Sequence, residues 1–414
     1  MVTRIRAWSL AMLMPAVILC GPAAEARSAF EADATIRLTY DDNISLSGEN
    51  GDPEEDLITN IIPHLGLTLA RPSMSFSADY YLRYAFYRDN TEFDRSEIKD
   101  IQRLEALLEL GEYRGLAFTA RDAIELVSVD ERALVSEDNE VVNKSNRNTL
   151  VLNPSYKGSL GKRMEISLDY SYKDITHTAD IADDRTESET TLKLTEEMSP
   201  ALKLYLRGSF RETKAELSDD YKYYQGVLGG NFKSPGGVLV ELEGGVGEYD
   251  YDGGQSSEIS IWRGAFVLPH SQRIKTSLEG SRSLGHSESD GAYEVDEWSL
   301  TTALSGKVIG EASIFKKTLD FTDGVRKDER RGVAFSAELD PERPLQAGLS
   351  LGYSECSFEP EDEDRDFYNA AIIVGYRMRK FGVSASYRYS FEDSDIPGMD
   401  VESNVYFIEV TASL

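Results

Sequence analysis

The chain has 414 residues, a formal net charge of -29 at pH 7 and 41% hydrophobic residues. So acidic a chain is not expected to bind nucleic acid through its phosphates. Beyond the N-terminal segment, no apolar run approaches the roughly 20 residues of a membrane-spanning helix, which excludes helical anchoring. The 22 Tyr and 16 Phe argue for ordered structure rather than acidic disorder.

The first residues have the layout of a secretory signal. Two arginines precede an apolar run over 7–19, and Ala-Glu-Ala at 24–26 forms an Ala-x-Ala cleavage site. Cleavage near Ala26 would leave a mature chain of 27–414, which we expect to form a single domain. Cys356 would then be its one cysteine, so we expect no intrachain disulfide.

The mature chain begins with strands of period two. Apolar and polar residues alternate over 30–40, and the alternation returns over 75–87. Further strands follow, separated in turn by short connections rich in turn residues and by long acidic ones. The long connections are 41–56, 88–97, 130–144, 174–185, 212–220, 250–256, 285–291, 322–330, 357–366 and 392–403.

Ten long and nine short connections predict twenty strands. Short turns at one end and longer loops at the other are typical of a transmembrane antiparallel up-and-down β-barrel, and bacterial barrels have an even strand number. The sequence therefore predicts an all-β protein in which 27–414 forms one barrel. Segments 98–110 and 312–321 fit the alternation poorly, so eighteen strands is the alternative.

One parity of the predicted strands carries charged residues in nearly balanced numbers. A polar lumen would take this face, where opposed charges either sort passing solutes or form salt bridges that stabilise the wall. The candidate lumen-lining residues are Arg37, Asp79, Arg83, Arg103, Glu105, Arg121, Arg147, Arg207, Glu243, Arg263, Arg377 and Arg388.

Aromatic residues of the other parity gather near the long connections. Rings with a polar tip prefer the membrane interface, so this row predicts the outer aromatic girdle of a barrel. Its members include Tyr40, Tyr84, Phe86, Tyr170, Tyr172, Phe210, Trp262, Trp298, Tyr353, Tyr368, Phe391 and Tyr406.

The sequence offers little for catalysis or cofactors. Its four histidines, His64, His177, His270 and His286, stand apart from nucleophile, phosphate-loop and metal-ligand motifs, so we expect no enzyme, no catalytic residue, no metal site and no cofactor. Carboxylates in the acidic loops suit Ca²⁺, but such charge runs are more often a solvated face.

The last segment, 404–414, alternates to the final residue. Tyr406, Ile408, Val410, Ala412 and Leu414 share the apolar parity. The segment resembles the closing strand of bacterial outer-membrane β-barrels, which the barrel-assembly machinery reads. That family usually ends in Phe, whereas this chain has Leu414.

The N-terminal part resembles a broad family of outer-membrane β-barrel porins, many of them encoded with exopolysaccharide or exosortase systems. The resemblance rests on Tyr-Asp-Asp-Asn at 40–43, an acidic loop, Pro-His-Leu at 63–65 and a Tyr-x-x-Tyr strand at 81–84. It implies a barrel in the Gram-negative outer membrane, in contact with its lipids and lipopolysaccharide.

Two classes of function follow as expectations. The first is a passive channel for exopolysaccharide export, whose partners would be periplasmic polysaccharide-export proteins and the polysaccharide itself, with a general porin as its variant. The second is a non-conducting structural or adhesive barrel that acts through its acidic extracellular loops. The fold alone does not choose between them.

Overall fold

The computed structural model describes residues 27–48, 51–129, 141–179, 181–251, 256–287, 291–322, 324, 326–339, 343–360, 362–396 and 399–413. The expected signal segment 1–26 and Leu414 lie outside the described residues.

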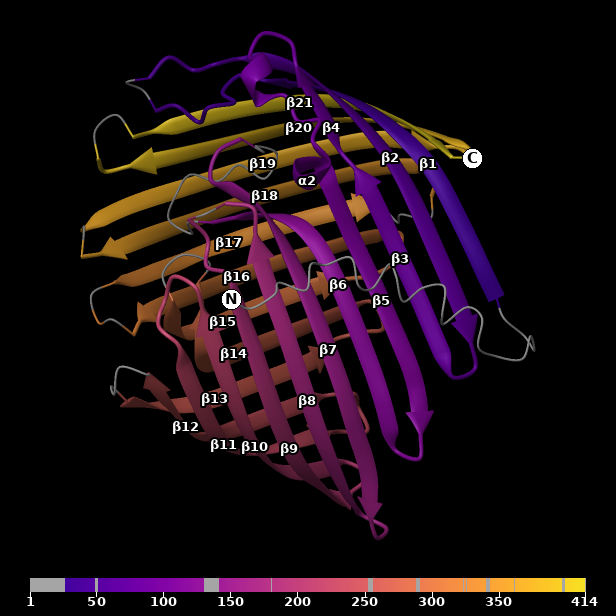
Figure 1. Cartoon of the computed structure of the whole chain (residues 1–414), viewed down its shortest axis with the longest axis vertical. Helices are drawn as coiled ribbons and strands as arrows, with labels where there is room; N and C mark the ends of the chain where they lie inside the picture. The colour runs from indigo at the N-terminus through magenta and orange to yellow at the C-terminus, as the bar shows by residue number, and fades with distance from the viewer. Residues whose placement is uncertain are drawn as a thin grey trace, which may run out of the picture.

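The described chain forms one antiparallel sheet that closes on itself (Figure 1). Each strand pairs with its neighbours in sequence, except that β3 and β4 both pair with β2 and β5 pairs with β3, and β1 pairs with β21 to close the ring. The strands are β1 (Arg27–Asp41), β2 (Asp56–Arg71), β3 (Met74–Leu82), β4 (Tyr84–Tyr87), β5 (Gln102–Tyr113), β6 (Leu116–Ser128), β7 (Lys144–Leu160), β8 (Met164–His177), β9 (Arg185–Ser199), β10 (Leu202–Ala215), β11 (Tyr221–Lys233), β12 (Leu239–Tyr251), β13 (Ser256–Pro269), β14 (Ile274–His286), β15 (Ala292–Leu304), β16 (Val308–Phe321), β17 (Lys327–Leu339), β18 (Leu345–Glu359), β19 (Glu363–Arg377), β20 (Phe381–Ser394) and β21 (Val401–Ser413).

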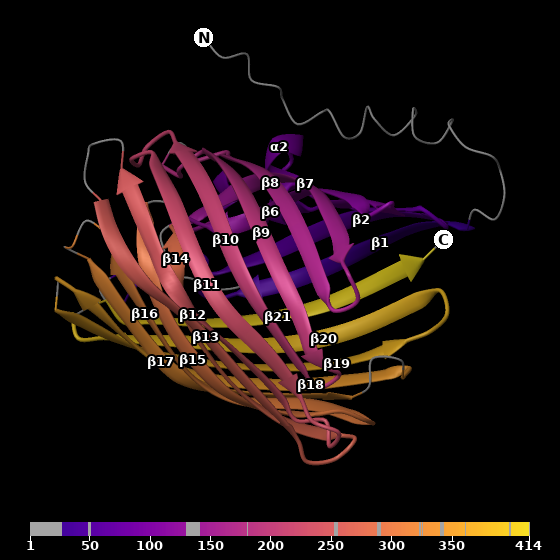
Figure 2. The same ribbon diagram turned by 90° about the horizontal axis from the view of Figure 1, so that it is seen from below.

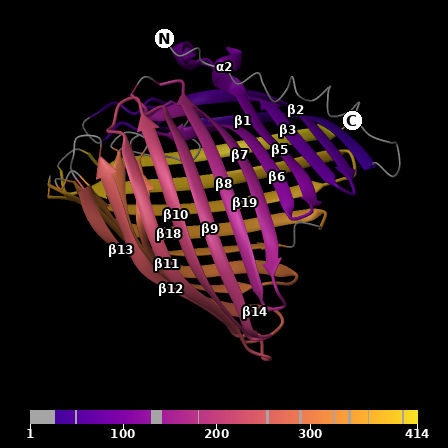
Figure 3. The ribbon, with the colours of Figure 1, turned by 60° about the horizontal axis from the view of Figure 1, so that its bottom comes forward.

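The barrel has twenty strands, as predicted. β3 and β4 are two halves of one strand that is interrupted at Arg83, because both pair with β2. The alternative of eighteen strands is wrong. Figure 2 shows the indigo β1 and the yellow β21 side by side where the barrel closes, and Figure 3 shows the N-terminal strands in front of the C-terminal ones.

Several predicted boundaries are wrong in detail. Segment 98–110 begins with a one-turn helix, α2 (Ile98–Ile101), which follows the 3-10 turn η1 (Thr91–Phe93), so Asp100 does not lie on a strand. In the described residues, no helix is long and apolar enough to cross a membrane. The predicted loop 357–366 is mostly strand, since β18 and β19 leave only 360–362 between them.

The two parities of each strand differ sharply in exposure. On β21, Phe407 faces inward and is 6% exposed, whereas its neighbours Tyr406 and Ile408 face outward and are 48% and 57% exposed. Val410 and Ala412 share the parity of Tyr406 and therefore point outward. Outward-facing apolar side chains on all sides give the wall the surface that a lipid bilayer requires.

Outward aromatic residues meet across neighbouring strands near the long-loop end. Tyr406 lies between Tyr40 and Tyr387, with ring centroids 6.3 Å and 4.8 Å away. Tyr368 contacts Tyr353 at 5.1 Å and Phe391 at 6.0 Å. Phe210 and Tyr224 form a similar pair at 5.0 Å. Six of the aromatics assigned to the girdle thus form cross-strand contacts on the outward face.

The closing seam carries an inward ion pair. Arg37 of β1 donates through Nε and Nη2 to Glu409 of β21, at 2.9 and 2.7 Å, and its guanidinium lies over the ring of Phe407. We expect Glu409→Gln to lower the free energy of unfolding by about 1 kcal/mol, because a charge-assisted bond is lost.

The measurement is guanidinium unfolding in detergent micelles. Glu105→Gln is the matched control, because Glu105 pairs with Arg121 at 3.0 Å but both side chains are more than half exposed. Its loss should cost less than about 0.5 kcal/mol. Equal losses for the two variants would show that the seam pair adds nothing to closure.

Candidate functional site in the barrel lumen

The strand register places the candidate lumen residues on the inward face. Arg37 sits opposite Glu409, Asp79 opposite Glu105, and Glu243 opposite Arg263. The same parity holds for Arg103, Arg121, Arg147, Arg207, Arg377 and Arg388, whereas Arg83 lies in the break between β3 and β4.

The structure divides these residues among separate groups rather than one cluster. Arg147 pairs with Glu125 at 2.7 Å, and Arg103 donates to the side-chain oxygen of Asn146 at 2.8 Å. Arg388 lies over the ring of Phe407, with 5.5 Å between its guanidinium carbon and the ring centroid.

A group of charged residues lines the inner wall from β9 to β16. Arg211 pairs with Glu189 at 2.9 Å, and Arg207 pairs with Glu243 at 3.1 Å. The hydroxyl of Tyr205 also donates to Glu243, at 2.7 Å. Hydrogen bonds between side chains of adjacent strands, and of β10 and β12 across β11, thus fix the positions of these charges.

A recess of about 670 Å³ lies in this wall. Its inward-facing basic residues include Arg207, Arg263 and Lys317, and its acidic ones include Glu243 and Glu297. Basic and acidic side chains face each other across adjacent strands, since Glu243 is opposite Arg263 and Glu297 is opposite Lys317. Such a surface offers many weak hydrogen bonds to the hydroxyl and carboxylate groups of a solute and no single high-affinity binding site.

A second recess, of about 780 Å³, lies closer to the short-turn end. Its lining includes Lys275, Glu311, Ser336, Ser350 and Arg388. Apolar side chains such as Ile309 and Ile373 also line this second recess, so it is less polar than the first.

The opposite wall holds a histidine that sequence reasoning left as structural. His64 of β2 lies between Asp33 at 2.7 Å and Asp79 at 3.3 Å, and it stacks on Tyr81 with 4.3 Å between ring centroids. All four point inward from neighbouring strands. Counting parity across β1, β2 and β3 would have brought these residues together.

Near the long-loop end, the lining of the lumen changes from charged to mostly apolar and aromatic side chains. There, aromatic and aliphatic residues, most of them of the inward parity, pack into an outer-rim cluster, in which Tyr221 is 2% and Tyr223 is 3% exposed. Deeper in the barrel, the inward side chain of Arg121 stays 56% exposed. The cluster comprises Tyr221, Tyr223, Val227, Tyr249, Ile259, Ile261, Leu284 and Ala292.

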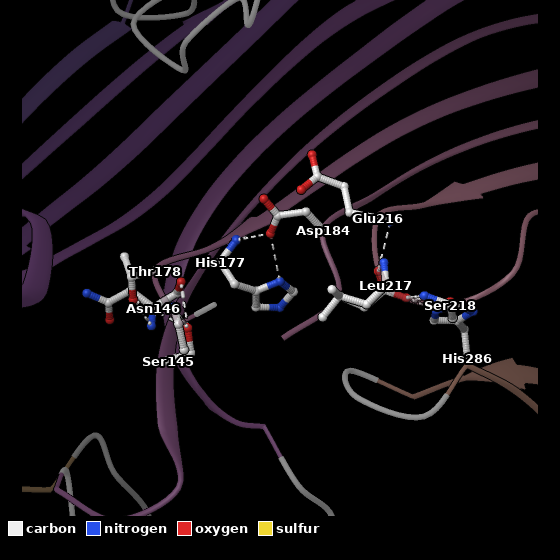
Figure 4. A network of polar contacts seen from close by, with 11 residues as sticks. Ser145, Asn146, His177, Thr178, Asp184, Glu216, Leu217, Ser218 and His286 are labelled. Carbon is white, nitrogen blue, oxygen red and sulfur yellow. Dashed lines mark hydrogen bonds and ion pairs between the residues drawn. The ribbon is translucent and has the colours of Figure 1, made fainter. Parts of the chain in front are cut away.

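A buried carboxylate joins three long loops above this cluster. Asp183, with 0% exposure, accepts backbone N–H bonds from Glu216 at 3.0 Å and Leu217 at 2.9 Å. The N–H and hydroxyl of Ser218 donate to its other oxygen, and His286 Nε2 lies 3.4 Å from that oxygen. Figure 4 shows Ser218 and His286 close together at this junction.

A neighbouring network fastens the same loop to the barrel from the other side. Asp184 accepts from the backbone N–H of His177 at 2.6 Å, with the ring Nδ1 at 3.3 Å (Figure 4). Thr178 meets Ser145 at 3.3 Å through its hydroxyl and accepts the N–H of Asn146 at 3.0 Å. Asp183 and Asp184 therefore tie one loop to different neighbours.

We expect the hydrogen bonds that Asp183 accepts from 216–218 to persist at mildly acidic pH. Burial alone would raise the pKa of Asp183, but contacts from His286, the Ser218 hydroxyl and the Leu217 N–H together hold that pKa below its usual range. A depressed pKa in the folded state adds stability that is present above the ordinary aspartate pKa and is lost only as pH falls through the lowered value.

We therefore expect hydrogen exchange of the amides of 216–218 to show unchanged protection factors as pH falls from 7 to about 4, the ordinary range of an aspartate. Asp183→Ala should lower the protection of the Leu217 and Ser218 amides at all pH values, whereas the Glu216 amide, which also donates to the carbonyl of Asp184 at 2.9 Å, should keep part of its protection. Loss of protection already near pH 5 in the native protein would contradict the buried, charged state of Asp183.

Metal ligands do not gather in the described part of the chain, where no group of three or more His, Cys, Asp and Glu side chains could hold an ion. Cys356 is a buried, free cysteine on the inward face of β18. It lies within a strand and not beside a loop as its sequence position suggested.

No family model and no curated protein matches the sequence. Among solved structures, the chain is similar to a mutant ferric enterobactin receptor from Pseudomonas aeruginosa, with a TM-score of 0.51 and 8% identity over 94% of this chain and 81% of that chain. The chain has the fold of the outer-membrane β-barrels.

Two further solved structures support the same fold. The FrpB iron transporter from Neisseria meningitidis matches with a TM-score of 0.51 and 7% identity, over 93% of this chain and 81% of that one. The ferric citrate transporter FecA in its unliganded form matches with a TM-score of 0.51 and 8% identity, over 93% and 78% of the two chains. At such identities the similarity concerns the fold alone.

Proposed function

We propose that this protein is a passive outer-membrane channel for hydrophilic solutes. The observation that carries the proposal is the inner wall from β9 to β16, where paired Arg and Glu side chains line a recess of about 670 Å³. Elsewhere in the lumen, the side chains of Arg121 on β6 and Glu105 on β5 remain more than half exposed, which a wall built only for stability would not need.

The cargo that best suits this lining is a saccharide, and we propose export of an exopolysaccharide as the specific role. Ion-paired charges offer hydrogen bonds to hydroxyls without trapping a polymer, and Lys193 lies over the ring of Tyr205 at 4.1 Å beside the Glu243 carboxylate. A general porin would use the same wall. The size of the largest solute that passes through the barrel distinguishes a general porin from a polysaccharide export channel.

The other assignments belong to the same proposal. The chain would reach the outer membrane after cleavage near Ala26, be folded by the barrel-assembly machinery through β21, and contact lipids and lipopolysaccharide through its outward face. Periplasmic polysaccharide-export proteins would meet the short-turn end. The proposed role is transport without catalysis or a cofactor.

Liposome swelling tests the proposal. Vesicles containing the refolded chain 27–414 should swell in neutral oligosaccharides and in uronic-acid oligosaccharides, unlike empty vesicles. The double variant Arg207→Ala, Arg263→Ala should lower the uronate rate several-fold, about threefold or more for two lost cation contacts, with little effect on neutral sugars.

The matched control is Arg331→Ala. Arg331 is an outward arginine of β17 that pairs with Glu355 at 2.6 Å, so its loss leaves the lumen unchanged. Swelling no faster than in empty vesicles, from a correctly folded barrel, would contradict the channel. It would favour the surface barrel, for which the packed outer-rim cluster is the supporting observation.

A further inference from the structure

The upper parts of the adjacent strands β13 and β14 are not paired with each other. Pairing of these two strands, both fully described here, runs from Pro269 and Lys275 up to Trp262 and Arg282. Above that point, 256–261 of β13 pairs with β12, and 283–286 of β14 pairs with β15. The upper end of β14 is therefore not held to the strand beside it.

The upper end of this hairpin leans over the lumen. Leu284 has the outward parity of Arg282, yet it is 7% exposed and packs in the outer-rim cluster with inward residues of β11 to β13. His286 stacks on Tyr221 of β11, with 6.0 Å between ring centroids. Ala292, at the start of β15, is buried in the same cluster.

The hairpin keeps a firm attachment on its other side. Tyr293 of β15 pairs with Phe321 of β16, and Thr322 donates its N–H to the carbonyl of Ala292 at 3.1 Å. An element that is paired along one edge and unpaired along the other can rotate about the paired edge. The β15–β16 ladder is thus the natural hinge.

On this edge, His286 lies within ion-pair distance of a buried carboxylate of an adjacent loop, without a hydrogen bond between the two. His286 Nε2 lies 3.4 Å from Asp183, the carboxylate that also collects the donors of Glu216, Leu217 and Ser218. Because Asp183 is fully buried, loss of its side chain would leave the backbone N–H groups of Leu217 and Ser218 without this acceptor and His286 without its anionic neighbour.

We propose that the upper end of the β14–β15 hairpin, residues 283–287 and 291–293, is a lid that narrows the outer mouth of the lumen and is fastened by Asp183. Rotation about the β15–β16 ladder would lift the lid from the outer-rim cluster and widen the mouth. The proposal adds regulation to the channel function and rests on it for its physiological meaning, although the movement itself can be measured separately.

The first test labels a cysteine beneath the lid. Ser281 points inward and lines the recess below the unpaired part of β14. The variant Ser281→Cys in a Cys356→Ser background is labelled on intact cells with a bulky, impermeant maleimide. The labelling rate reports how easily the recess is reached from outside. Asp183→Ala should speed labelling about fivefold or more, because the lid loses the contact of His286 with a buried carboxylate.

The matched control is Asp184→Ala, which changes the next carboxylate of the same loop but leaves the lid contact in place. It should label at the parent rate. Equal labelling of the Asp183 variant and its parent would overturn the lid.

The second test locks the lid. A Cβ atom built on Gly291 lies 3.3 Å from the Cβ of Ser218, close to the spacing of a disulfide. The pair Ser218→Cys, Gly291→Cys, again in the Cys356→Ser background, should give a constant small conductance when oxidised and recover larger openings when reduced. The single variants control for strain at Gly291, whose φ is +85°.

These outcomes separate the two proposals. Conducting barrels in which oxidation and reduction make no difference would overturn the lid and leave the channel in place. Faster labelling of the Asp183 variant in a barrel that never conducts would support the lid and overturn the channel function.

Discussion

Replacing Gly245 by alanine is expected to separate β11 from β12 locally and to lower the free energy of unfolding by about 3 kcal/mol. Gly245 faces inward opposite Val227, where a Cβ atom would lie 2.0 Å from the carbonyl oxygen of Gly226 and 2.8 Å from the Cα of Val227. Both obstacles are backbone atoms, so no side chain can move aside.

Gly244 supplies the matched control for this prediction. It is the preceding residue of the same strand, and a Cβ atom built on it meets nothing within 4 Å. Gly244→Ala should leave the unfolding midpoint in guanidinium nearly unchanged, or raise it slightly, because alanine loses less backbone entropy than glycine. Similar midpoints for the two variants would contradict the close approach of β11 and β12.

Asp56→Ala should open the loop between β4 and β5. The buried carboxylate of Asp56 accepts backbone N–H bonds from Arg88 at 2.9 Å, Asp89 at 3.2 Å and Asn90 at 2.8 Å, and a side-chain bond from Asn90 at 3.0 Å. With its acceptor gone, the loop should lose about 2–3 kcal/mol of local stability.

Limited trypsin digestion measures this effect, because Arg88 and Arg95 lie in the loop. Cleavage should become at least about tenfold faster, the factor that corresponds to 1.4 kcal/mol of local opening. Asp52→Ala, which removes an exposed carboxylate four residues away, should be cleaved at the native rate. Native-like resistance of the Asp56 variant would show that the loop is held by other contacts.

The architecture could be predicted because the signal is local. A strand of period two separates its faces within a few residues, so Arg37 and Tyr406 can be assigned to opposite faces before any partner strand is known. Alternating long and short connections then give the strand number. The single helical turn at Ile98–Ile101 was missed because four residues carry no helical period.

The outer loops could not be predicted because their contacts join distant parts of the chain. The acidic runs suggested a solvated face, and this interpretation is wrong for Asp56 and Asp183, which are buried and hydrogen-bonded. The partners of Asp183 lie 33 or more residues away. The predicted connection 285–291 included His286, whereas this residue ends β14 and stacks on Tyr221.

Within the lumen, sequence parity predicted which charged residues face inward but not which of them meet. Arg207 contacts Glu243 across an intervening strand, over a separation of 36 residues. Such pairs depend on the twist and width of the barrel as well as on parity. The recess that they line therefore emerges only from the three-dimensional structure.

Single-channel conductance of the refolded chain 27–414 in a planar bilayer tests the central claim most directly. The account predicts steady conductance steps, with larger and longer openings for Asp183→Ala than for Asp184→Ala. A correctly folded barrel that carries no current in either variant would contradict the polar channel and leave the loop surface as the functional part of the molecule.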